Sequence, residues 1–224
     1  MGVGHVALAL GASRAAPRVN VGWLVFAALL SDFLLGIFAM LGLEHATVPA
    51  HYESQHYLLF TFPYSHGLVA LLVWAALLGF LVSRAYGFDG KRLLMVIAPV
   101  TLSHFVLDGL VHVAGLPLVG ENSPKFGLAL WNHMPLELTL ETLMAIVGIA
   151  MYWKLASPST FAVGRYGMAI FVGLVTVMTW TQLLATTPPR AQQLAVAWIV
   201  VPLMFSAIAY GLDRKRARAA AIIQ

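Results

Sequence analysis

Charge-poor apolar runs that are long enough to cross a lipid bilayer recur along the whole of this 224-residue sequence. They cover residues 21–43, 64–83, 93–117, 134–153, 166–186 and 191–211. A transmembrane helix needs about 20 apolar residues. Lipid offers no hydrogen-bond partner to a bare backbone, so such runs are helices unless they alternate as barrel strands do. These runs do not alternate. The sequence therefore predicts an all-α, polytopic membrane bundle of about six spans, forming a single membrane domain over residues 1–224.

The composition supports this fold class. Hydrophobic residues make up 60% of the chain and charged residues only 10%, whereas a typical soluble domain is about 25% charged. The chain therefore has too little polar surface for an ordinary soluble fold.

The basic residues are divided unequally between the two sides of the predicted bundle. One set of connections holds only Lys125 and Arg190. The opposite set holds eleven basic residues: Arg14, Arg18, Arg84, Lys91, Arg92, Lys154, Arg165, Arg214, Lys215, Arg216 and Arg218. Connections rich in Lys and Arg stay in the cytoplasm, so both termini are expected there. The apolar stretch Val3–Ala12 is too short to cross, and we expect a short N-terminal half-helix that ends at the same face.

The sequence pI near 9.6 is then a signal of topology. Membrane lipids are the expected partners of the C-terminal run Arg214–Arg218, because anionic headgroups attract such clusters. No nucleic-acid partner is expected.

Ionisable residues inside the spans are the candidate functional groups, because they are costly in lipid and usually face the bundle interior. His104, Asp108 and His112 follow one another at intervals of four and share one helix face. Asp32 and His66 come from other spans, and His5 from the N-terminal stretch. With a rise of about 1.5 Å per residue, these groups fall in one layer between mid-membrane and the outer interface. Each lone group can equally serve helix packing.

Glu137 and Glu141 repeat the four-residue spacing on the next span and reach the same layer. A carboxylate in a site of low dielectric has a raised pKa, so Glu137 or Glu141 is the natural general base, and both are candidates for that catalytic role. The histidines and acids of the outer loop around residues 44–56, Glu44 among them, are expected to be solvated, although Glu44 ends the first span at the right height to approach the cluster.

A metal site in this chain must use His, Asp or Glu, because the sequence has no cysteine. Such a ligand set suits a divalent metal, with zinc first and manganese or iron as alternatives.

Several short motifs resemble a family of small bacterial inner-membrane proteins described as membrane-bound metal-dependent hydrolases. The similarity covers roughly residues 4–153. Its landmarks are His5 with Ala16-Pro17-Arg18, the Asp32 span ending at Glu44, Pro63-Tyr64-Ser65-His66, Ser103-His104 through Asp108 to His112, and Gly127–Asn132. The resemblance implies a multi-pass protein of the bacterial inner membrane. It also implies a metal site built from His66, His104 and Asp108, with His5 and Asp32 as further ligands.

The sequence thus favours a metal-dependent hydrolase whose intramembrane site opens towards the outer leaflet and takes a lipid-linked substrate. A non-enzymatic subunit of a larger membrane complex, binding a cofactor or structural only, is the first alternative. An ion or metal transporter is the second, because intramembrane His, Asp and Glu also mark ion pathways.

Overall fold

The computed structural model describes residues 2–86, 90–155 and 158–222. It is mostly helical, at 72%. The helices of the described residues are α1 (Val3–Ala12), α2 (Val21–Ala28), α3 (Leu30–Met40), α4 (Tyr52–Gln55), α5 (Leu68–Tyr86), α6 (Gly90–Val111), α7 (Met134–Leu155), α8 (Pro158–Trp180) and α9 (Ala191–Ile222), with short 3-10 turns η2 (Leu130–His133) and η3 (Thr181–Leu184). The strands are β1 (His45–Thr47), β2 (Leu59–Thr61), β3 (Leu116–Pro117) and β4 (Lys125–Phe126).

Four to five of these helical segments are long and apolar enough to cross a membrane. Four are continuous, over Leu93–Val111, Leu130–Leu155, Ala162–Leu184 and Ala191–Arg218, and the bent pair α2 and α3 makes a fifth. The apolar part of α5, Leu68–Arg84, is shorter. The sequence predicted that this span starts at residue 64, but residues 63–67 form a turn that ends at the helix start. The predicted span 93–117 is also shorter, because the end of that run pairs as a strand.

The first long span is broken at Leu29, where α2 and α3 meet at an angle of 52°. Asn20 caps α2 by accepting a hydrogen bond from the backbone amide of Gly22, as N-cap residues do. The break was not predicted from the sequence, in which the residues from Val21 to Leu30 contain no proline or charged residue. Its consequence is that the carbonyl of Ala28 is available to a side chain of another helix.

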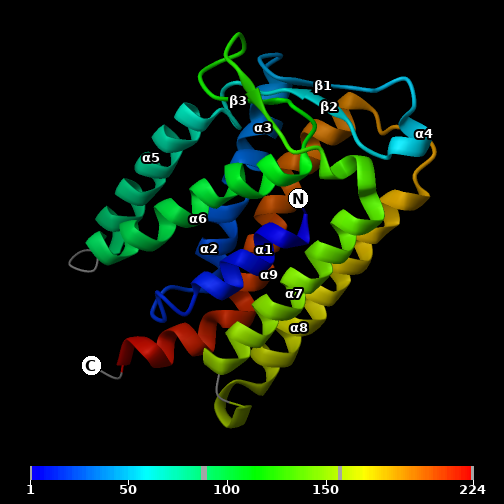
Figure 1. The fold of residues 1–224 in the computed structure, drawn as a ribbon. Helices are drawn as coiled ribbons and strands as arrows, with labels where there is room; N and C mark the ends of the chain where they lie inside the picture. The colour runs from blue at the N-terminus through cyan, green and yellow to red at the C-terminus, as the bar shows by residue number, and fades with distance from the viewer. Residues whose placement is uncertain (1, 87–89, 156–157, 223–224) are drawn as a thin grey trace.

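Two short antiparallel hairpins lie together at one end of the bundle (Figure 1). Strand β1 pairs with β2, placing His45 opposite Thr61, and β3 pairs with β4. The end of α5, the start of α6 and the end of α9 lie towards the other end (Figure 1).

Helix α1 is a ten-residue helix in the middle of the bundle, where Figure 1 shows the N-terminus. It packs against α7, α2 and α6. Close approach to α7 depends on Gly148, where an added Cβ would lie 2.6 Å from the carbonyl oxygen of Ala7. Small residues at such crossings are the usual means of packing helices in membranes. The expectation of a short N-terminal helix is confirmed.

A buried polar clamp fixes the turn between α1 and α2 and the start of α2. Asp213 on α9 accepts hydrogen bonds from the amide of Val21 at 2.8 Å and the hydroxyl of Tyr152 at 2.8 Å. Arg216 donates to Asp213 and to the carbonyls of Pro17 and Val19. The turn that precedes α2 is therefore tied to the last helix of the chain.

Candidate metal centre

Six metal-ligating side chains from four segments meet beside α1. The contributing segments are α1 (His5), α3 (Asp32), the turn before α5 (His66) and the outer half of α6 (His104 and Asp108, with His112 directly after its last residue). All are buried except Asp32, whose side chain is 27% exposed. The convergence expected from helix rise and spacing is therefore what the structure contains.

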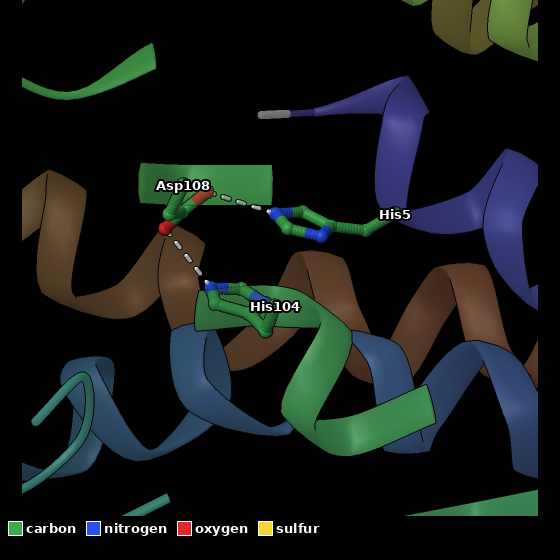
Figure 2. A group of neighbouring side chains, drawn as sticks. All are labelled: His5, His104 and Asp108. Carbon is green, nitrogen blue, oxygen red and sulfur yellow. Dashed lines mark hydrogen bonds and ion pairs between the residues drawn. The ribbon is translucent and has the colours of Figure 1, made fainter. Parts of the chain in front are cut away.

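Asp108 lies at the centre of this cluster. Its Oδ1 is 3.1 Å from Nε2 of His5, and its Oδ2 is 3.2 Å from Nε2 of His104. Figure 2 shows Asp108 facing both rings. The same Oδ2 lies 3.4 Å from His112 and 3.7 Å from His66. One carboxylate thus faces four imidazoles. Its Oδ1 faces His5, and its Oδ2 faces the other three histidines.

His104 also lies beside His66 and Asp32, with which it forms a second group of possible metal ligands. Nε2 of His66 lies 3.1 Å from Nε2 of His104. Oδ1 of Asp32 is 3.7 Å from Nε2 of His66 and 3.9 Å from Nε2 of His104. His5, His104 and Asp108 form one group that could hold a metal ion, and Asp32, His66 and His104 form another.

The spacing of the ligand atoms fits a bound cation. Among Nε2 of His66, Nε2 of His104, Oδ1 of Asp32 and Oδ2 of Asp108, five separations lie between 3.1 and 3.9 Å. Ligand atoms at zinc–nitrogen and zinc–oxygen distances around a tetrahedral ion are roughly 3.4 Å apart. Two nitrogens and two carboxylate oxygens suit zinc, and manganese or iron as well.

The ring of His5 is held against that of His104, with the ring centroids 3.9 Å apart and the planes nearly parallel at 3°. Nδ1 of His5 is buried without a hydrogen-bond partner among the described residues. Buried polar atoms are normally paired, so this nitrogen is available to a ligand.

A cavity of about 280 Å³ adjoins the cluster. Asp32, His66, Asp108 and His112 contribute to its wall. The rest of the wall is largely apolar and includes Leu35, Phe60, Phe62, Trp131, Val175, Met178, Trp198, Val201 and Phe205. The described lining residues include no Lys or Arg. This combination of an apolar wall with a few convergent polar groups is typical of a small-molecule site.

The two glutamates on α7 occupy different environments. Both oxygens of Glu141 accept hydrogen bonds from the start of α1, from the amides of Gly2 at 2.9 Å and Gly4 at 3.0 Å. Glu137, one turn earlier, is buried, and neither of its oxygens has a hydrogen-bond partner within the described part of the chain. Glu141 therefore holds the start of α1 in place, whereas Glu137 lies beside the carboxyl of Glu141 and is not among the residues that line the cavity.

Glu44 was expected to be solvated, and this was wrong. Its side chain is 1% exposed and contacts Ser65, next to His66. Burial raises the pKa of Glu44 above its ordinary value, although hydrogen bonds from Ser65 and Tyr64 oppose the shift. The only sequence signal was its position at the outer end of the span that carries Asp32. His45, His51 and His133, in contrast, are exposed.

The chain was compared with models of protein families, with curated proteins and with solved structures, and none of them matches. The resemblance noted from short motifs therefore identifies no family. The protein is helical, with several apolar helices and a buried His/Asp cluster.

Proposed function

We propose that this chain is a multi-pass protein of the bacterial inner membrane and a metal-dependent hydrolase that acts on a lipid-linked substrate near the outer leaflet. The observation that carries the proposal is the set of four ligand atoms from His66, His104, Asp32 and Asp108 at the mutual spacing of ligands around one ion. Buried charged and polar groups are rare inside membrane proteins and are functional candidates by default.

The proposed topology places the hairpins outside and the basic connections inside. In this arrangement α5 and the bent pair α2 and α3 also cross, which gives the six spans predicted from the sequence. The eleven-to-two division of basic residues supports it. The cavity wall includes Phe60 of β2 and Trp131 of η2, so the site adjoins the hairpin end of the bundle and, on this topology, the outer leaflet.

A divalent ion in such a site lowers the pKa of water and polarises the bond to be cut. Asp108 and the histidines hold their positions because each is buried among packed helices. Asp32, which is partly exposed and lines the cavity, is the ligand that faces an entering substrate. Glu137 is the better of the two candidate bases, since the oxygens of Glu141 are occupied by the amides of α1. A base must reach the proton that it removes.

The apolar cavity wall supports a lipid-linked substrate. Aromatic and aliphatic side chains from α8 and α9 face a space that also contains His66, Asp108 and His112. Such a wall can hold an acyl or isoprenoid chain, while the polar groups meet the bond at headgroup depth. Phosphoester and acyl ester bonds are the two candidate targets.

The proposal can be tested with purified, zinc-loaded protein in mixed micelles. The substrates are one fluorogenic lipid with a phosphoester link and one with an acyl ester link. We expect hydrolysis of one of them, abolished by a chelator and by Asp32→Asn and unchanged by Glu53→Gln, which alters an exposed residue. Hydrolysis of neither substrate by metal-loaded protein would count against a hydrolase, and equal rates in wild type and Asp32→Asn would count against this site.

A further inference from the structure

A buried hydrogen-bonded chain runs from the hairpin end of the bundle to the candidate metal centre. Oε1 of Glu44 accepts from the amides of Tyr64 at 2.7 Å and Ser65 at 2.9 Å. Oε2 of Glu44 lies 2.6 Å from the hydroxyl of Ser65, and this hydroxyl lies 2.7 Å from Nδ1 of His66. Glu44, Ser65 and His66 are each at most 2% exposed.

The chemistry of the partners fixes the direction of this chain. A carboxylate only accepts hydrogen bonds, so the O–H of Ser65 points to Glu44. The oxygen of Ser65 can then only accept at its remaining short contact, so Nδ1 of His66 carries the proton and donates. In a neutral imidazole the other nitrogen is then a bare acceptor. Nε2 of His66 therefore presents its lone pair to the cluster.

His104 is fixed in the same tautomer by a different partner. Its Nδ1 lies 2.7 Å from the carbonyl oxygen of Ala28, at the break between α2 and α3. A carbonyl only accepts, so Nδ1 donates, and in the neutral imidazole that ligates a metal Nε2 is then bare. Two lone pairs thus face each other across 3.1 Å, with the carboxylates of Asp32 and Asp108 beside them. A cation stabilises such a group of acceptors.

We infer that Glu44 and Ser65 are positioning residues, which hold His66 in the metal-ligating tautomer and thereby set the affinity of the buried site for a divalent cation. The inference rests on the metal site of the proposed function. Partners behind a ligating histidine commonly orient it in this way, and their loss weakens metal binding by about 10–100-fold.

The substitution Glu44→Gln should reverse the direction of the hydrogen bonds from residue 44 to His66 without changing the size of the side chain. The position of Oε1 faces two backbone N–H donors, so the amide oxygen must take that place. The NH₂ group then faces Ser65 and donates to it. The hydroxyl of Ser65 turns to Nδ1 of His66, and the proton of His66 moves to Nε2, which can no longer ligate.

Cobalt titration and tautomer measurement together test this inference. Co²⁺ is added to detergent-purified wild type, Glu44→Gln, Ser65→Ala and Thr101→Val, and binding is followed by visible absorption. Nitrogen NMR of histidine-labelled, metal-free protein reports the proton position on His66. Thr101→Val is the matched control, because the hydroxyl of Thr101 is buried on α6 without a partner among the described residues.

We expect the affinity for Co²⁺ to fall by about 10–100-fold in Glu44→Gln. The fall should be smaller in Ser65→Ala, which removes the hydrogen bond to His66 but does not force the proton onto Nε2. Thr101→Val should bind as wild type does. In metal-free protein, His66 should carry its proton on Nδ1 in wild type and on Nε2 in Glu44→Gln.

Wild-type affinity in folded Glu44→Gln, or the same tautomer in both proteins, would overturn the inference. Should Glu44→Gln not fold, unchanged affinity in Ser65→Ala would do so. A wild type that binds no Co²⁺ would instead refute the metal site, while the NMR result would still decide the role of Glu44.

Discussion

At position 108 a single carboxylate faces the imidazoles of His5, His66, His104 and His112 within 3.7 Å. The i, i+4, i+8 spacing on α6 was enough to predict that His104, Asp108 and His112 share a face. It also predicted that this face is turned inward, because such groups are expensive in lipid. Their exact partners depend on other segments and were outside the reach of that argument.

Substitutions of the two α7 glutamates should have different effects, because we assign Glu141 to positioning α1 and Glu137 to the reaction. Glu141→Gln replaces an acceptor that two amides of α1 require, so we expect a loss of about 1–3 kcal/mol in stability and weaker metal binding through displaced His5. Glu137→Gln should keep stability and metal but lose turnover. Thermal unfolding in detergent, metal content and hydrolysis rate measure the difference. The reverse pattern, with Glu137→Gln unstable and Glu141→Gln only inactive, would contradict this assignment.

At the scale of helices and turns, the site depends on two local features. Neither could be predicted from the sequence. The break at Leu29 frees the carbonyl of Ala28 for His104. The turn at residues 63–67 brings Ser65 onto buried Glu44. The run before the break contains no proline or charge that would mark it, and the burial of a loop carboxylate depends on tertiary contacts. Helix type and approximate span positions were predictable because apolarity and length decide them in lipid.

The contact between α1 and α7 should be sensitive to one methyl group. An added Cβ at Gly148 would lie 2.6 Å from the carbonyl oxygen of Ala7, so Gly148→Ala should push α1 away. We expect a cost of about 1–3 kcal/mol and reduced metal affinity, since α1 carries His5. Gly173→Ala on α8 is the matched control, because nothing lies within 4 Å of the added atom. It should be neutral or stabilising by up to about 1 kcal/mol. Equal melting temperatures for the two variants would argue against tight α1 packing.

At the scale of the whole molecule, the described residues form two buried polar centres that lie apart from each other. One is the His/Asp cluster, near the hairpins, and the other is the clamp of Asp213 and Arg216, which ties α9 to the turn before α2. Glu141 fixes the start of α1, and the clamp fixes the turn between α1 and α2. The position of His5 therefore depends on the contact between the start of α1 and Glu141 of α7.

The proposed topology predicts opposite accessibility for the two ends of the bundle. The chain has no cysteine, so single cysteines can be placed at Ser54 and Lys215, both exposed. In intact spheroplasts a membrane-impermeant thiol reagent should label position 54 and leave position 215 unlabelled until the membrane is permeabilised. Labelling of position 215 alone in intact cells would invert the topology, and equal labelling of both would refute it.

The metal content of purified protein tests the central claim most directly. We expect wild type prepared without chelators to contain about one transition-metal ion or more per chain by elemental analysis. His104→Ala should lose the metal and remain folded, because the apolar faces and small residues still pack. His133→Ala, which removes an exposed histidine, should retain it. Wild type without stoichiometric transition metal, or folded His104→Ala with its metal content unchanged, would contradict the account.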